Sequence, residues 1–415
     1  MQIPPALRHR PYALFWFGML ISMAGSMMQV WTLYWHIRQL TDQPIALSGI
    51  GVARFVPILA FSLFAGLIAD RFNRRRVLFV TQSVMAAVAA ALALLTMSGQ
   101  IQVWHIYLLT AIQAAATSFD MPARQALVPN LVARKDLPNA FSMNSIAFNT
   151  GAIAGPALSG LTIGWLGLQG VYWINSASFL VLIVMLIAMG DIPQESSMVI
   201  RERPRGMIDF AAIGEGILYI RRSPIILSSM ILDFFATFFS AANTLLPFVA
   251  KDILHVGVIQ YGWLSAGQSI GAVSVGLILS QRSRIRRQGA LLLGAVVVFG
   301  LATVVFGLGV SFWVVFFALI AIGGADEVST ILRNTIRQMQ TPDHIRGRMV
   351  SINQIFFSGG PQLGEVESGL VAQAFGVPAA IISGGLGCIL AVAVIAGIWP
   401  QLRKYDGSEP APVAV

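Results

Sequence analysis

Acidic residues are rare in the long apolar runs of this sequence, and three of them could carry chemistry. Asp233 lies well inside one run, and Asp326 and Glu327 lie together in another. A carboxylate in such surroundings is costly, so it is a candidate for carrying a proton or for binding a substrate. Arg333 follows Asp326 by two helical turns on the same face. We therefore expect Asp233, Asp326 and Glu327 to carry protons or to bind substrate.

The composition excludes a soluble enzyme. Of the 415 residues, 56% are hydrophobic and 11% are charged, whereas soluble domains carry about 25% charged residues. The apolar runs are continuous rather than alternating, which excludes a β-barrel and indicates membrane helices of about 20 residues each. We predict an all-α membrane protein with twelve transmembrane helices, at residues 12–38, 46–69, 77–98, 104–128, 140–166, 170–190, 223–250, 260–280, 289–308, 311–336, 348–375 and 377–400.

The basic residues are distributed unevenly between the loops. The chain carries 27 Lys and Arg against 18 Asp and Glu, a net charge of +9. On one predicted side of the membrane the loops contain only Arg38 and Lys251, so the other side, with both termini, is expected to be cytoplasmic. This bias explains the net charge without a nucleic-acid partner. Cys388 is the only cysteine and the five histidines lack ligand spacing, so we expect no disulfide and no metal site.

The two halves of the chain repeat each other. Arg124 and Arg333 are 209 residues apart, as are Asn144 and Asn353. Repeated six-helix halves are typical of secondary transporters, with a substrate site between the halves near the membrane midplane. We predict an N-terminal six-helix half at 1–190, a cytoplasmic linker at 191–222, a C-terminal six-helix half at 223–400 and a cytoplasmic tail at 401–415.

The loop after the second predicted span carries a recognisable motif. Residues 66–76 read GLIADRFNRRR, which resembles the G-x-x-x-D-R-x-G-R-R signature of the major facilitator superfamily. Asn73 replaces the usual glycine, and asparagine tolerates the left-handed conformation better than most residues. With the 6+6 arrangement and the central linker, the resemblance covers nearly the whole chain. It implies the major facilitator fold, two pseudo-symmetric halves that move by alternating access.

The same resemblance suggests a cytoplasmic latch around this loop. Asp120 and Arg124 are four residues apart and share a helical face, so an Asp70–Arg74–Asp120 cluster would close the inner side. The alternative is a topology anchor with static ion pairs. The predicted latch residues are Gly66, Asp70, Arg71, Arg74, Asp120, Arg124 and Arg333.

The fifth predicted span carries a second motif, GAIAGPALSG at 151–160. It resembles the G-x-x-x-G-P-x-x-G-G motif of drug:proton antiporters, with Ser159 in place of one glycine, and the pattern around 119–129 is similar to enterobactin-type and macrolide-efflux exporters. The arginine that many such antiporters carry early in the fourth span is absent, because Leu108 and Leu109 stand there. Plain helix packing is the alternative. The predicted kink residues are Gly151, Gly155, Pro156 and Gly160.

Two further sets of residues are expected around a substrate path. In this superfamily the second and eleventh spans are neighbours, so Arg54 and Glu365 are predicted to pair in an outer gate. The alternative is that Arg54 extends toward the membrane surface (snorkels) or pairs within its own half. Polar and aromatic residues on the spans that line the cavity of related transporters suit varied amphipathic substrates. The predicted cavity residues are Gln29, Trp31, Tyr34, Gln113 and Asn243.

These observations predict a monomeric secondary transporter in a bacterial cytoplasmic membrane. It would export an amphipathic small molecule, such as a drug, a siderophore-like compound or a lipid-like compound, by proton antiport. The alternatives are a proton-coupled importer of a metabolite, a lipid flippase and a non-transporting membrane sensor. The sequence lacks a phosphate-binding loop, so we expect neither ATP drive nor any other cofactor.

Overall fold

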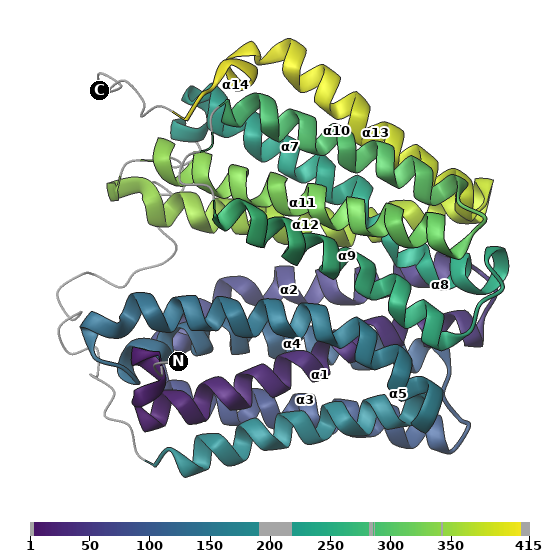
Figure 1. The fold of residues 1–415 in the computed structure, drawn as a ribbon. Helices are drawn as coiled ribbons and strands as arrows, with labels where there is room; N and C mark the ends of the chain where they lie inside the picture. Colours follow the sequence, from purple (N-terminus) through teal and green to yellow (C-terminus); the bar gives the residue numbers. More distant parts are fainter. Residues whose placement is uncertain (1–3, 191–217, 282–284, 286, 342, 408–415) are drawn as a thin grey trace. The chain divides into compact units, whose positions relative to one another are not determined.

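The computed structural model describes residues 4–190, 218–281, 285, 287–341 and 343–407, with the side chains of 62–71 and 343–358 outside this description. Helices are the only regular elements among the described residues (Figure 1). It divides into two compact units, one formed by Met1–Pro204 with Val256–Ala266 and the other by Arg205–His255 with Gly267–Val415. Helix α9 (Val258–Ser280) therefore begins in the first unit and continues in the second.

The helices of the first unit correspond closely to the predicted spans. They are η1 (Pro5–Arg8), α1 (Arg10–Leu40), α2 (Ile45–Arg71), α3 (Arg74–Met97), α4 (Val103–Leu127), η2 (Val128–Asn130), η3 (Arg134–Asp136) and α5 (Leu137–Ala188). The element α5 is broken at Gly167, whose φ of 72° and ψ of 178° are not helical. Glycine takes this positive φ readily because it has no Cβ, and the break separates the two spans predicted at 140–166 and 170–190.

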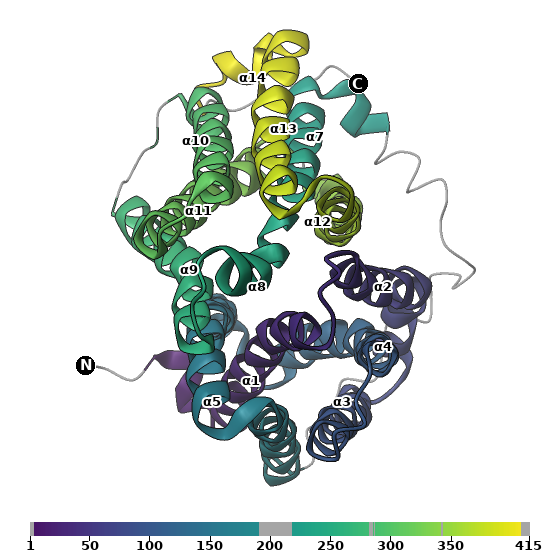
Figure 2. The same ribbon diagram turned by 90° about the vertical axis from the view of Figure 1, so that its right-hand side faces the viewer.

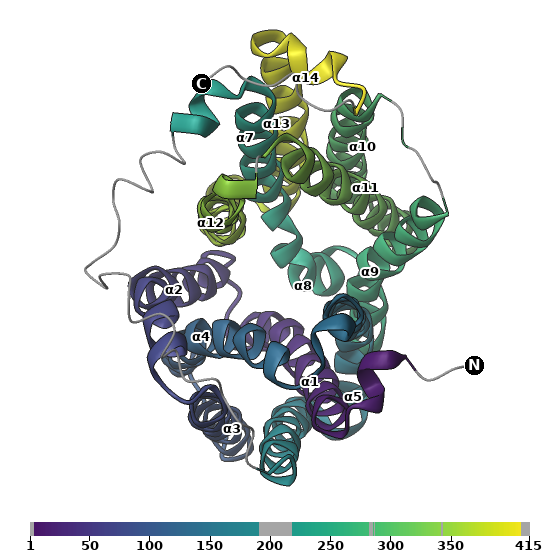
Figure 3. The same ribbon diagram turned by 90° about the vertical axis from the view of Figure 1, so that its left-hand side faces the viewer.

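The second unit contains, after a short described helical stretch at 218–222, a segment that changes its helical type. This segment consists of α7 (Pro224–Ser240), η5 (Ala241–Leu245), α8 (Leu246–Phe248) and η6 (Val249–Ile253). The remaining helices are α10 (Gln288–Leu308), α11 (Phe312–Gln340), α12 (Asp343–Phe375), α13 (Val377–Ile398) and α14 (Pro400–Lys404). Within this unit α10 packs against α11 and α13, and α7 packs against α12 and α13 (Figures 2 and 3).

Eight helical segments among the described residues are long and apolar enough to cross a membrane. Helices of this kind are required in lipid because every backbone N–H and C=O must be paired internally. They are Arg10–Leu40, Arg74–Met97, Arg134–Ala188, Pro224–Ile253, Val258–Ser280, Gln288–Leu308, Phe312–Gln340 and Val377–Ile398. The all-helical membrane fold is thus confirmed, whereas the number of twelve spans and the cytoplasmic termini remain predictions.

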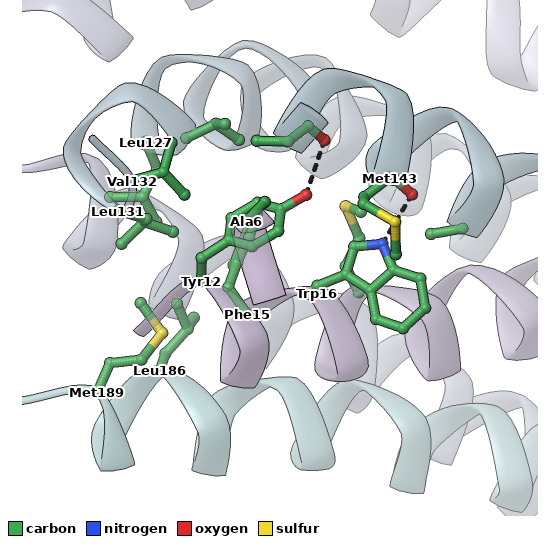
Figure 4. Packing of buried hydrophobic residues seen from close by; sticks show 14 of the residues in the cluster. Ala6, Tyr12, Phe15, Trp16, Leu127, Leu131, Val132, Met143, Leu186 and Met189 are labelled. Carbon is green, nitrogen blue, oxygen red and sulfur yellow. Dashed lines mark hydrogen bonds between the residues drawn. The ribbon is translucent and has the colours of Figure 1, made fainter. Parts of the chain in front are cut away.

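The start of the first unit has a well-packed core. In Figure 4, Tyr12 and Trp16 of α1 lie among apolar side chains of α4, α5 and the η2 region. Their polar ends are paired: the Tyr12 hydroxyl donates to the Ala140 carbonyl at 2.7 Å, and the Trp16 indole N–H donates to the Met143 carbonyl at 2.7 Å. Buried polar atoms are satisfied in this way when their aromatic bodies fill a core. These contacts fix α1 against α5.

Candidate functional site

The second unit contains a buried cluster of charges between α7 and α11. The Asp233 carboxylate lies 2.9 Å from Nη1 of Arg337 and 3.2 Å from Nη2 of Arg333. All three residues are buried. Arg333 and Arg337 are four residues apart on α11, so both guanidinium groups project from one helical face toward α7. The cluster therefore joins two helices through charge-assisted hydrogen bonds, which are stronger than neutral ones.

Arg337 is a member of this cluster that sequence reasoning missed. Its i+4 spacing from Arg333 was the available signal, but Arg337 lies one residue beyond the span predicted at 311–336. Arg337 also donates to the Asn334 side chain at 2.6 Å. Arg333 donates to Thr330 at 3.0 Å, and its Nε and Nη1 have no hydrogen-bond partner among the described residues.

Asp326 lies at the edge of the cluster. Its carboxylate is 3.8 Å from Nη2 of Arg333, as the shared face of α11 predicted, and its side chain is 53% exposed. It lines a cavity of about 220 Å³ together with Asn243 and Gln268. The Asn243 Oδ1 and the Gln268 Nε2 are buried without hydrogen-bond partners in the described part of the chain. The cavity therefore presents a carboxylate, an amide acceptor and an amide donor to whatever enters it.

Glu327, the third predicted carboxylate, is placed differently. It follows Asp326 directly on α11 and is half-buried. It faces α9, because a Cβ at Gly276 would lie 3.6 Å from the Glu327 Oε1. The two neighbouring carboxylates therefore face different surroundings. Asp326 lines the cavity, whereas Glu327 lies beside Gly276 of α9.

The first unit contains its own buried ion pair. The Arg124 Nε donates to the Asp120 Oδ2. The other carboxylate oxygen of Asp120 accepts hydrogen bonds from Thr81 at 2.8 Å and from the Gln82 amide at 2.7 Å. Arg124 also reaches the Ser22 hydroxyl at 3.4 Å. This arrangement ties α1, α3 and α4 together.

The motif loop is organised around Asn73 and Arg74. The Asn73 side chain accepts from the backbone N–H groups of Arg75 and Arg76 and caps α3, and its φ of −60° is not the left-handed conformation that we expected. Arg74 donates to the Ala126 carbonyl at 3.1 Å and to Asn130 at 2.8 Å, whereas Asp120 is occupied by other partners. The Gly66, Asp70 and Arg71 side chains lie outside the described residues, so the predicted latch remains a prediction.

Two of the predicted cavity residues belong to a buried amide chain. The Gln29 Nε2 donates to the Gln113 Oε1 at 2.6 Å, and the Asn175 Nδ2 donates to the Gln29 Oε1 at 2.6 Å. Gln29 is 1% exposed. Its amide therefore serves to connect α1, α4 and α5, because unpaired buried amides are costly.

The predicted gate residue Arg54 contacts the aromatic residue Tyr34. Its guanidinium donates to the Tyr34 hydroxyl at 2.9 Å and lies 5.5 Å from the centre of the Tyr34 ring, an arrangement that favours a cation. Trp31 accepts a hydrogen bond at its carbonyl from the Tyr261 hydroxyl at 2.9 Å. Glu365 is buried in the second unit, and its pairing with Arg54 stays a prediction.

The glycines of the fifth-span motif are helix contacts. A Cβ at Gly151 would lie 3.1 Å from the Ala24 backbone nitrogen, and one at Gly155 would lie 3.0 Å from the Met28 backbone nitrogen. These two glycines therefore let α5 approach α1. Gly160 and Gly262 approach equally closely, since a Cβ on Gly160 would lie 2.6 Å from the Gly262 Cα. Close helix approach through small residues is common in membranes.

The motif proline lies on the same helix, α5. Pro156 is inside α5 and is buried, where it removes a backbone hydrogen bond and favours a kink. These contacts account for the motif by packing, and its antiporter role stays a prediction.

Comparison with known proteins gives a consistent result. The profile of the family described as "Transmembrane secretion effector" matches residues 4–414. The multidrug efflux pump Tap of Mycolicibacterium fortuitum is 26% identical over 95% of this chain and 97% of its own length. The enterobactin exporter EntS of Citrobacter koseri is 25% identical over 87% and 84%. A crystal structure of a bacterial homologue of the human lysosomal transporter Spinster shares the fold, with a TM-score of 0.74, 15% identity and full coverage of both chains.

Proposed function

Since the chain belongs to the transmembrane secretion effector family of the major facilitator superfamily, we propose that it exports amphipathic small molecules by proton antiport. It is a multi-pass cell-membrane protein and a transporter rather than an enzyme. In this proposal it works as a monomer with twelve spans, cytoplasmic termini and two halves that alternate access to a central site. The relatives Tap and EntS, named for efflux of drugs and of enterobactin, support the export direction.

The observation that carries the proposal is the position of Asp326. Its carboxylate lines a cavity and lies 3.8 Å from a buried guanidinium group. With Asp233, Arg333 and Arg337, the cluster contains two negative and two positive charges. A proton on Asp326 would leave this cluster with a net positive charge inside the second unit. Such a change in charge beside a buried cluster gives two conformations different free energies, which is the requirement for coupling.

Asp233 has a different role in this mechanism. It is held by two guanidinium groups and is fully buried. Protonation of Asp233 would leave both cations without their nearest counter-charge, which is strongly unfavourable for a buried pair. Asp233 therefore acts as the fixed counter-ion that positions Arg333, and Asp326 is the carboxylate that exchanges its proton with the cavity.

The gating residues complete the proposal. The Asp120–Arg124 pair holds three helices of the first unit together, and the motif loop beside it supplies the latch on the cytoplasmic side. Arg54 is oriented by Tyr34 and forms the outer gate with Glu365. These pairs break and form as access alternates.

The test is substrate-triggered proton movement in liposomes. The purified protein would be reconstituted with an internal pH dye and challenged with ethidium, erythromycin and a catecholate siderophore. Asp326→Asn should lower the coupled proton flux by at least about tenfold, equivalent to 1.4 kcal/mol. The matched control is Asp252→Asn in η6, a carboxylate outside the cluster.

Each result decides between mechanisms. Substrate movement without proton flux in the wild type would contradict antiport and favour a uniporter or a flippase. Equal proton flux in Asp326→Asn and the wild type would remove Asp326 from the coupling mechanism. Substrate accumulation driven in the import direction by the same gradient would favour a proton-coupled importer.

A further inference from the structure

A second cavity, of about 510 Å³, lies within the first unit among α1, α4 and α5. Its size is within the range of about 300–1,000 Å³ that is usual for small-molecule sites. Its apolar wall is formed by Met19, Met23, Met121, Phe141 and Phe148. Methionine and aromatic side chains adapt to ligands of different shapes. The wall therefore fits the apolar body of a small molecule.

The cavity is also lined by the polar residues Gln125, Asn144, Ser145 and Asn149 and by one charged residue, Arg124. Its Nε is paired with Asp120 and its Nη2 reaches Ser22 at 3.4 Å. Its Nη1 is buried and has no hydrogen-bond partner in the part of the chain that the structure describes. Buried guanidinium N–H groups are rarely left unpaired, so an unpaired one beside a cavity points to a partner that enters from outside the protein. That partner must be a hydrogen-bond acceptor, because guanidinium has only donors.

The surrounding charges determine which kind of acceptor fits. The charge of Arg124 is already balanced by Asp120, which itself accepts hydrogen bonds from Thr81 and Gln82. The ion pair is therefore neutral as a whole and is buried. A ligand anion would find no net positive charge here, because Asp120 already balances the Arg124 guanidinium group. A neutral oxygen, by contrast, would satisfy the free N–H without adding charge.

We infer that this cavity binds a neutral amphiphile that carries a carbonyl oxygen, such as a ketone, an amide or a lactone. The carbonyl accepts a hydrogen bond from Arg124, and the apolar body lies against the methionine and phenylalanine wall. That the bound molecule is cargo rests on the proposed export function, whereas binding itself does not. The site is separate from the carboxylate-lined cavity of the second unit.

A photoreactive ketone tests the inference directly. The probe is 4-hexyloxybenzophenone, which is neutral and amphipathic and whose excited carbonyl attacks nearby C–H groups. The full chain in phosphatidylcholine nanodiscs would be irradiated with the probe, and the labelled peptides identified by mass spectrometry. Labelling is expected in the segments that contain Met19, Met23 and Met121.

Two variants and one control make the labelling specific. Ser145→Trp places a large ring on a residue that lines the cavity and should reduce labelling of these segments at least about tenfold. Ser142→Trp, on the same helix but outside the lining, should label like the wild type. Arg124→Lys keeps the charge but loses the planar set of donors, and should reduce labelling about fivefold, the usual effect of one hydrogen bond.

Competition identifies the chemistry of the ligand. Progesterone, a neutral diketone, should protect the cavity segments, while the cation ethidium and the anion 1-anilinonaphthalene-8-sulfonate should not. Better protection by the anion would overturn the neutral-acceptor inference. Protection by diacylglycerol but not by progesterone would assign the site to lipid and overturn the cargo inference.

The two proposals fail in different ways. If Ser145→Trp and the wild type label equally, the cavity does not bind the probe, whatever the proton-flux assay shows. If labelling behaves as expected but no proton flux accompanies substrate movement, the cavity inference stands and antiport fails. Arg124→Lys is interpreted only if its thermal unfolding matches that of the wild type, and Ser145→Trp does not depend on that condition.

Discussion

Arg124 and Arg333 occupy equivalent positions in the two repeated halves, yet their buried guanidinium groups are balanced by carboxylates from different places. Arg124 pairs with Asp120, one turn earlier on the same helix. Arg333 pairs at 3.2 Å with Asp233, which lies on α7. The first unit thus has an ion pair within one helix and the second has one between two helices. Arginines at equivalent positions of the sequence repeat are therefore neutralised in two different ways.

The first prediction concerns the ion pair between helices. Asp233→Ala should lower the free energy of unfolding by about 3–5 kcal/mol, because it leaves two buried arginines without a counter-charge. Asp326→Ala, beside the same cluster but half-exposed, should cost about 1 kcal/mol or less, since an exposed ion pair contributes little. Denaturant unfolding of both variants in detergent would measure this difference. Equal losses would show that Asp233 is not the main counter-ion.

A second prediction addresses the ion pair of the first unit. Asp120→Ala and Arg124→Ala should each lower the free energy of unfolding strongly. The loss in the double variant should be smaller than the sum of the two single losses by about 1–3 kcal/mol. The physical reason is that each single change leaves one buried charge and the double change leaves none. A double-mutant cycle on thermal stability measures the coupling. Additive losses would contradict a direct pair.

Helix packing at the fifth-span motif gives a third prediction. Gly155→Val should destabilise by about 1–3 kcal/mol, because its side chain would overlap Met27 and the backbone of Met28 on α1. Gly294→Val is the matched control on α10, where a Cβ would meet no atom within 4 Å. Unfolding in detergent compares the two. A larger loss at Gly294 would mean that close packing does not explain the motif.

The cap of α3 is the subject of the fourth prediction. Asn73→Ala should cost about 0.5–2 kcal/mol, since the Asn73 side chain satisfies two backbone N–H groups at the start of this helix. Asn73→Asp keeps an acceptor oxygen and should retain the stability. Asn73→Gly, the residue usual at this place in the related motif, should cost only a few tenths of a kcal/mol. If Asn73→Ala melts like the wild type, the cap contributes nothing.

The outer gate supplies the fifth prediction. Arg54→Glu and Glu365→Arg should each reduce transport in proteoliposomes, and the combined charge swap should restore at least part of it if the two residues pair. Tyr34→Phe serves as the control for the local contact of Arg54, because it removes the hydroxyl that accepts its hydrogen bond. A swap variant as inactive as the single variants would exclude the pairing.

Several features of this protein follow from its sequence. Long apolar runs with 11% charged residues must form helices in a membrane, since lipid offers no partner for an open backbone. The position of Gly167 between two apolar runs marks a break that the structure confirms. The family is also readable, because the motifs at 66–76 and 151–160 and the repeat of the halves each carry a recognisable spacing. The seven-residue interval from Asp326 to Arg333 correctly places both on one face of α11.

The partners of the buried polar residues were decided only by the tertiary structure. Asp233 meets Arg337 from 104 residues away, and Gln29 meets Asn175 from 146 residues away. A transmembrane helix is apolar on every side, so its sequence contains little amphipathic pattern to indicate which face is buried. The rotation of each helix about its axis is set by packing against its neighbours. That rotation turned Asp326 toward a cavity and Glu327 toward α9, a difference that two adjacent carboxylates in a sequence do not reveal.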